Sequence, residues 1–186
     1  ARLRGIFMNL TTRKITGTAV LGALTIVLTL ISNYITIGTI SINLALLPIA
    51  MASIMYGPLS AFIVGLINGG FILLAPSTQA VFMPMSLVGT IFVCLLKTSL
   101  AGLASGFIYK LFKTHQNIGM VVSSLVIPVI NTGIFLIGSY IFFNGAFGSI
   151  IDLFVSVNFA IEFVVTALLS PTTVRIINTA KISSNQ

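Results

Sequence analysis

Charge is what this sequence has least of. Only 6% of its 186 residues are charged, against roughly 25% in an ordinary soluble domain. Just two residues are acidic, no residue is tryptophan, and 57% of the chain is hydrophobic. A water-facing surface cannot be built from so few charges, so the composition excludes an ordinary soluble globular domain. It predicts a single domain embedded in a membrane.

Reactive groups are equally scarce. Cys94 is the only cysteine, which excludes an intrachain disulfide and a cysteine metal site, and its apolar surroundings favour a small buried side chain. The chain has no glycine-rich nucleotide loop, no metal-ligand cluster and no nucleophile with a base in sequence reach. We therefore predict a protein that is not an enzyme and has no cofactor. Any ATP used with it must be bound by another subunit.

Six apolar segments fill the chain. They predict an all-α membrane protein, a compact six-transmembrane-helix bundle occupying residues 15–177, between a basic lead-in at 1–14 and a polar tail at 178–186. The first segment is long and has no small-residue cleavage site, so we expect a membrane helix and not a cleaved signal peptide. The turn signal Gly57-Pro58 separates the second and third segments, and Pro48 interrupts the second. The helices are expected at about 15–37, 43–56, 59–74, 85–112, 118–143 and 152–177, with a polar loop at 75–84.

Most of the basic residues follow one topological pattern. They precede the first helix, follow the fourth and close the sixth, at Arg2, Arg4, Arg13, Lys14, Lys110, Lys113, Arg175 and Lys181. The loops at 38–42, 75–84 and 144–151 contain no Lys or Arg. The positive-inside rule then places both termini in the cytoplasm. The net charge of +7 reflects this topology, and we expect no nucleic acid as a partner.

Lys97 is the basic residue that topology does not explain. Its place in the fourth helix predicts a position near the middle of the bilayer, where an ammonium costs about 2.5 to 3.5 kcal/mol and needs a partner. Glu162 of the sixth helix and Asn131 of the fifth are expected in the same layer. Nearer the outside, other helices and one loop offer further polar side chains, at Asn158, Asn68, Tyr140 and Gln79.

Two interpretations of these polar residues stay open. In the first, Lys97 and Glu162 form a buried ion pair that fixes the fourth helix against the sixth. In the second, an ammonium and several carboxamides line a cavity, open to the outside, that holds a small oxygen-rich and anionic solute. The two are compatible, because Glu162 can position Lys97.

A small-residue face marks the first helix. Ala19 and Ala23 are four residues apart and therefore lie on one side, one turn from each other. Such a face lets another helix approach closely. The approaching helix can belong to a partner protein or to the same chain.

From Lys14 to about Ile177, the chain resembles the substrate-binding S components of energy-coupling factor (ECF) vitamin transporters. The shared features are six helices in a short chain, the basic lead-in, the Ala19/Ala23 pair and the turn 55–58. More narrowly, the stretches at 97–110, 131–135, 158–162 and Pro171 resemble the pantothenate-specific members.

The resemblance implies a subunit of the bacterial cell membrane that captures a water-soluble vitamin from outside. A transmembrane T component, docking at Ala19 and Ala23, and two ATPase subunits would then drive uptake. Pantothenate has a carboxylate, an amide and two hydroxyls, which suits one ammonium and several carboxamides. Another vitamin on the same scaffold, a stand-alone transporter coupled to ions through Glu162 and Lys97, and a ligand-free assembly factor are the alternatives.

Overall fold

The computed structural model describes the backbone of residues 2–34, 36–37, 40–41, 43–112, 114–143 and 149–183, and the side chains of 12–33, 43–112, 114–143 and 157–179. This part of the chain forms six α-helices. Their bounds are α1 Arg2–Tyr34, α2 Leu46–Met55, α3 Pro58–Ile72, α4 Leu87–Leu111, α5 Gln116–Phe142 and α6 Ser149–Ser183. The smaller elements are β1 Thr36–Ile37, β2 Ile40–Ser41 and the π-helical turn η1 Thr78–Phe82.

Four of the helices contain a stretch long and apolar enough to cross a membrane, at 12–33, 87–111, 116–142 and 157–179. The other two are shorter. At about 1.5 Å per residue, α2 is about 15 Å long and α3 about 22 Å, against roughly 30 Å of hydrocarbon. The all-helical membrane architecture is therefore confirmed, whereas six crossings and cytoplasmic termini stay predictions.

Some element bounds differ from those expected. α1 runs without a break through the basic lead-in, and it ends at Tyr34 because residues 36–37 pair with 40–41 as an antiparallel ladder. The expected loop at 75–84 contains η1, and α6 continues to Ser183. The rest of the tail, most of the expected loop at 38–42 and the segment 144–148 lie outside the described residues.

Local sequence explains where two helices begin. Gly57 has a φ of 93°, a conformation that a residue without a Cβ adopts readily. Pro58 follows as the first residue of α3, where its missing N–H is not needed. The Ser86 side chain accepts a hydrogen bond from the Gly89 N–H at 3.2 Å, which caps α4 at the end where its first N–H groups lack helical partners.

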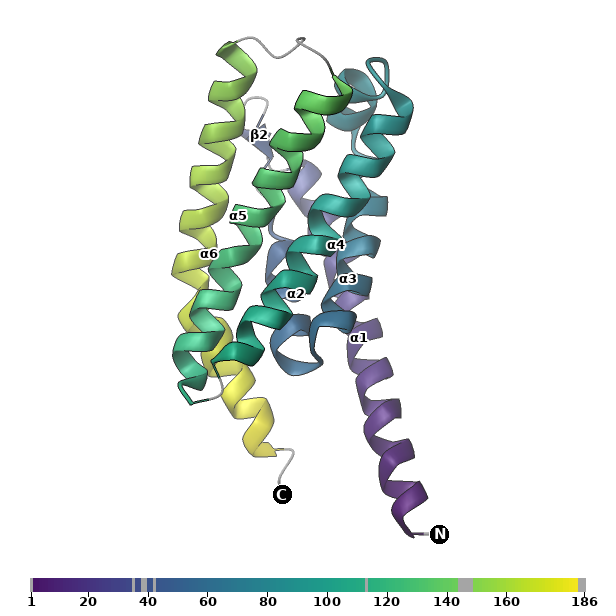
Figure 1. The fold of residues 1–186 in the computed structure, drawn as a ribbon, viewed down its shortest axis with the longest axis vertical. Coiled ribbons are helices and arrows are strands. Elements are labelled where there is room, and N and C mark those ends of the chain that lie inside the picture. Colours follow the sequence, from purple (N-terminus) through teal and green to yellow (C-terminus); the bar gives the residue numbers. More distant parts are fainter. Residues whose placement is uncertain are drawn as a thin grey trace.

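The short helix α2 lies at the centre of the bundle. It contacts α1, α3, α4, α5 and α6. Figure 1 shows it in the half of the bundle nearer the point where α1 begins and α6 ends, which we call the terminal end, whereas β2 lies nearer the opposite, distal end. The other helices thus surround α2 only over part of their length.

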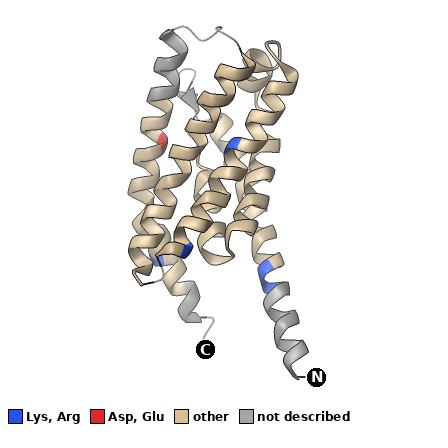
Figure 2. Ribbon diagram, viewed as in Figure 1, with Lys and Arg blue, Asp and Glu red and all other residues tan. Residues whose placement is uncertain are grey.

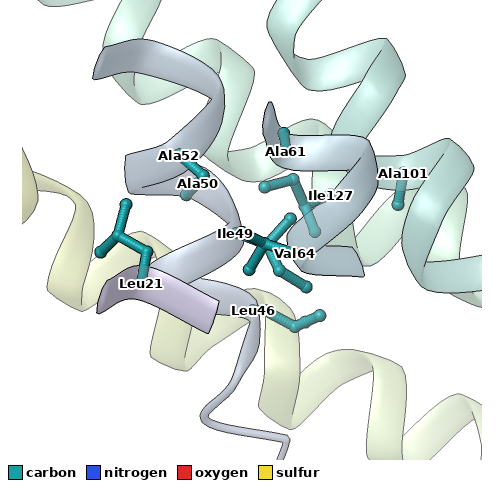
Figure 3. Packing of buried hydrophobic residues seen from close by; sticks show 9 residues of the cluster. All are labelled: Leu21, Leu46, Ile49, Ala50, Ala52, Ala61, Val64, Ala101 and Ile127. Atoms are coloured by element: carbon teal, nitrogen blue, oxygen red, sulfur yellow. The ribbon is translucent and has the colours of Figure 1, made fainter. Parts of the chain in front are cut away.

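An apolar core joins α2 to four of its neighbours (Figure 3). Ile49 of α2 is fully buried and lies beside Val64 of α3 at the centre of this cluster. Five helices contribute its buried members, which are Leu21, Leu46, Ile49, Ala50, Ala52, Ala61, Val64, Ala101 and Ile127. The terminal half of the bundle therefore contains a close-packed apolar core, with small hydroxyl residues such as Ser53 and Ser105 buried nearby.

Glycines bring α3 and α4 into backbone contact. A Cβ atom added at Gly65 would lie 2.5 Å from the carbonyl oxygen of Thr98, and one at Gly69 would meet the carbonyl of Cys94. The Thr98 hydroxyl donates to the Gly65 carbonyl at 2.7 Å across the same contact. Small residues allow this approach in a membrane bundle, where packing and hydrogen bonds replace the hydrophobic drive between helices.

Substitution of Gly65 by alanine is expected to destabilise the protein by about 1 to 3 kcal/mol, because the added methyl overpacks a backbone contact. Gly70 is the matched control: it lies on the same helix, and a Cβ there meets nothing within 4 Å. Gly70→Ala should leave stability unchanged or slightly increased, since alanine is the better helix former. Thermal unfolding in detergent measures both variants, and equal melting temperatures for the two would contradict the described packing.

The outer surface and the charges agree with a membrane location. Large apolar side chains are exposed along the helices, including Leu111 at 80% and Leu168 at 72%, as expected of residues that face lipid. Figure 2 shows the described basic positions mainly at the terminal end. The side chains of Arg2, Arg4, Lys113, Asp152 and Lys181 are outside the described set.

Candidate functional site

The interior changes from apolar to polar beyond the distal end of α2, where this helix begins at Leu46. Val64, Ala101 and Ile127 belong to the core around α2. One turn further toward the distal end, the same faces of α3, α4 and α5 hold Asn68, Lys97 and Asn131, because residues four apart share a helix face. Three helices thus replace a hydrocarbon group with a polar one at depths that differ by little more than one helical turn.

These residues, with Asn158 and Glu162 of α6, form what we call the polar layer. The contacts of Gly65 and Gly69 with α4 place Lys97 within about 3 Å of Asn68 along the helix axes, at 1.5 Å per residue. Gly138 of α5 packs on Val93, which sets Asn131 about one turn nearer the terminal end than Lys97. The layer is therefore about one helical turn thick.

Glu162 organises two of the carboxamides. It is 4% exposed, and it accepts hydrogen bonds from Nδ2 of Asn131 at 3.4 Å and from Nδ2 of Asn158 at 3.1 Å. Because an ionised carboxylate only accepts, it fixes both amides with their NH₂ groups toward itself. The carbonyl oxygens of Asn131 and Asn158 are buried and have no partner among the described residues.

Lys97 lies beside this arrangement without a direct bond to Glu162 in the described part of the chain. Its Nζ is 5.1 Å from the centre of the Phe135 ring, a distance at which a cation is attracted to the ring face. The ammonium also attracts the Glu162 carboxylate electrostatically. Lys97 as a whole residue is half-buried.

An aromatic group lies toward the distal end from Lys97. The Phe82 ring of η1 packs edge-on against Phe135 at 5.7 Å between centroids and against Phe143 at the same distance. The Thr90 hydroxyl of α4 lies 2.9 Å from the Phe82 carbonyl of η1 and 2.8 Å from the Ser86 carbonyl, and it shares its proton between these two oxygens. Ser139 lies between Phe135 and Phe143 in sequence, is 5% exposed, and has a buried hydroxyl without a partner among the described residues.

Asn68 is fully buried and contacts α1. Its Oδ1 lies 2.8 Å from the Thr29 hydroxyl, and its Nδ2 has no partner within the described ranges. Thr29 is itself 2% exposed. The layer therefore extends from α6 through α5, α4 and α3 to the buried face of α1.

The structure leaves two of the expected site residues outside the layer. The Tyr140 ring is 85% exposed, because it points away from the buried face that Ser139 and Phe143 occupy. Gln79 is also exposed, and its Nε2 reaches only the Leu73 carbonyl at 3.5 Å. Both residues therefore lie outside the candidate site.

Thr29 and Ser139 were not expected from the sequence. Short hydroxyl side chains inside apolar helices commonly bond to their own backbone, so they carry little signal. For Ser139 a signal does exist: Asn131, Phe135 and Ser139 recur every four residues and therefore share one face of α5, and Phe143 continues the pattern directly after the helix.

The chemistry available is binding rather than reaction. The polar layer offers one ammonium, buried carbonyl oxygens and one carboxylate whose oxygens are engaged by amides. No group of three or more His, Cys, Asp or Glu that could hold a metal occurs among the described residues. Such a set suits a solute with a negative group and several hydrogen-bond donors.

Ala19 and Ala23 are both exposed on α1. They lie among exposed large side chains such as Ile15 at 64% and Val20 at 61%. The buried side of α1 is formed instead by Leu21, Thr25, Thr29 and others that face the bundle. The small-residue face is thus open to a partner helix or to lipid.

Comparison with known proteins gives one family. The chain matches the family described as "ECF transporter, substrate-specific component" over residues 13–177, which is most of its length. No curated protein and no solved structure matches the chain. Members of this family are membrane-embedded transporter subunits, not enzymes, and they work with a T component and ATPases. The chain belongs to the family of ECF transporter substrate-specific components.

Proposed function

We propose that this chain is the substrate-capture subunit for pantothenate, which it binds from outside the cell at the polar layer. The observation that carries the proposal is the change beyond the distal end of α2, where Val64, Ala101 and Ile127 of the core give way to Asn68, Lys97 and Asn131. A bundle that buries such groups without mutual pairing gains from a ligand that pairs with them.

The polar layer offers hydrogen-bonding groups of the kinds that pantothenate needs. Its carboxylate suits the Lys97 ammonium in a charge-assisted contact. Its two hydroxyls and its amide N–H are donors, and the buried carbonyls of Asn131 and Asn158 are acceptors without partners in the described structure. Glu162 supports the match indirectly, because it occupies the NH₂ groups of both amides.

Lysine in place of arginine influences selectivity. An arginine would hold a carboxylate through two parallel hydrogen bonds, whereas Lys97 offers a compact charge with rotatable donors. Phe135 stabilises that charge in the absence of a ligand anion. We therefore expect a site that requires a negative group but tolerates some variation in its orientation.

Packing supports entry from the distal end. The core around Ile49 and a second cluster of Ile54, Met120 and Ile177 pack the terminal half of the bundle closely. With the termini in the cytoplasm, as the positive-inside rule predicts, the polar layer is reached from outside. Release to the cytoplasm then requires the partner subunits, a T component that docks at Ala19 and Ala23 and two ATPases.

Titration calorimetry of the purified chain against a panel of vitamins tests the ligand. We expect pantothenate to bind, and pantothenol, in which an alcohol replaces the carboxylate, to bind at least about thirtyfold more weakly because it loses a charge-assisted contact of 2 kcal/mol or more. Binding of a different vitamin in preference to pantothenate would retain the subunit role and reject the ligand.

Uptake into liposomes tests the subunit role. Transport is expected only when the T component, both ATPases and ATP are present. Pantothenate uptake by the purified chain alone, driven by a proton or sodium gradient, would contradict the subunit role and support an ion-coupled transporter using Glu162 and Lys97.

A further inference from the structure

The Thr29 hydroxyl has one proton to donate and two oxygen acceptors within hydrogen-bond distance. Its Oγ1 lies 2.7 Å from the Thr25 carbonyl and 2.8 Å from Oδ1 of Asn68. A hydroxyl donates once and accepts through its lone pairs. One proton shared between two oxygens makes two weak bonds, whereas both contacts are fully satisfied if the one with Asn68 has the opposite direction.

A half-turn of the Asn68 carboxamide resolves the conflict. The amide nitrogen and oxygen then exchange places, which leaves the shape of the side chain unchanged. Thr29 donates to the Thr25 carbonyl and accepts from Nδ2 of Asn68, so both contacts become hydrogen bonds. The atom of Asn68 left without a partner is then the carbonyl oxygen.

After this half-turn, Asn68 has the same hydrogen-bonding arrangement as the other two asparagines of the polar layer. Glu162 holds the NH₂ groups of Asn131 and Asn158 and leaves their carbonyls unpaired. Thr29 does the same for Asn68 from the opposite side of the bundle. The polar layer then presents three carbonyl acceptors around the Lys97 ammonium, which equals the number of donors, two hydroxyls and one amide N–H, that pantothenate carries.

We propose that Thr29 is a positioning residue, which fixes Asn68 with its carbonyl toward the ligand and thereby couples ligand binding to the packing of α1. The inference rests on the proposed function of the polar layer. A ligand donor on the Asn68 carbonyl polarises the amide and strengthens its bond to Thr29. The exposed face of α1 holds Ala19 and Ala23, so occupancy of the layer holds the docking helix against α3.

Thr29→Val tests the coupling, because valine keeps the shape and removes the hydroxyl. We expect pantothenate affinity to fall about three- to tenfold, the effect of one hydrogen bond. We also expect the ligand-induced slowing of amide hydrogen exchange over residues 24–32 to disappear. Thr29→Ser should restore both measurements, since it restores the hydroxyl.

Thr25→Val is the matched control. Thr25 is fully buried on the same helix, and its hydroxyl donates only to the Leu21 carbonyl at 2.8 Å in the described structure. This variant should keep wild-type affinity and ligand-dependent protection. Size-exclusion profiles like that of the wild type establish that each variant folds.

Two outcomes distinguish a failure of the proposed coupling through Thr29 from a failure of the proposed ligand. Wild-type affinity and wild-type protection in Thr29→Val would overturn the role of Thr29 while leaving the ligand site intact. Failure of the unaltered chain to bind pantothenate would reject the proposed ligand instead, and the vitamin that the panel does identify then replaces it in the same comparison of variants.

Discussion

Pantothenate affinity is expected to fall by more than about thirtyfold when Lys97 is replaced by methionine. The substitution keeps an unbranched apolar stem and removes the ammonium. Loss of one partner from a desolvated charged contact costs about 2 to 5 kcal/mol, and about 1.4 kcal/mol corresponds to tenfold in affinity. Calorimetry on the detergent-purified variant gives the measurement.

A second variant distinguishes a ligand contact from a structural role. Lys97→Met leaves the Glu162 carboxylate without the ammonium that attracts it, and this alone could disturb folding. The double variant Lys97→Met/Glu162→Gln removes both charges. We expect it to fold like the wild type and still to bind pantothenate weakly, whereas recovered binding would mean that Lys97 serves only to neutralise Glu162.

Lys110→Met is the control for the change of charge. Lys110 is exposed in the last turn of α4, with its Nζ 5.7 Å from the centre of the Phe107 ring. It lies about 20 Å along the helix from Lys97, at 1.5 Å per residue. Its replacement should leave pantothenate affinity unchanged, and an equal loss in both single variants would argue against a specific ligand contact at Lys97.

Assembly with the T component is expected to weaken at least tenfold when Ala23 is replaced by leucine. A close helix–helix contact built on small residues does not accommodate a larger side chain, and overpacking of this kind costs about 1 to 3 kcal/mol. Ala19→Leu should act in the same way. Co-purification of the T component with each variant measures the effect, and pantothenate affinity should change little.

Ala160→Leu provides the matched substitution elsewhere. Ala160 is an exposed alanine on α6, so leucine there adds the same bulk to a different surface. It should leave assembly intact. If Ala160→Leu and Ala23→Leu weakened assembly equally, α1 would not be the docking helix; if Ala23→Leu also abolished ligand binding, misfolding would be the explanation.

Much of the fold follows from the order of residues in the chain. Long apolar segments and scarce charge predict membrane helices, since a helix in lipid satisfies its own backbone. Glu162, Asn131 and Asn158 stand out for the same reason: buried polar groups in such a helix need partners, and the structure brings these three together. Lys97 stands out because topology explains the other basic residues.

Tyr140 and Gln79 show where reasoning from sequence fails. A residue near the end of a helix can face the interior or the lipid, and a rotation of about 100° per residue separates the two. Tyr140 follows the buried Ser139 and is exposed. Gln79 lies in η1, whose π-helical turn was not predicted and directs the side chain outward.

By itself, the sequence determined the membrane class, the approximate helices and the polar residues that need an explanation, because these follow from composition and local spacing. The tertiary structure alone decided the central place of α2, the depth at which its hydrocarbon core ends, and the bond between Asn68 and Thr29. These depend on how helices far apart in the chain pack against one another. Helix rotation and register are set by such long-range contacts, through the close approach at Gly65 and Gly69 among others.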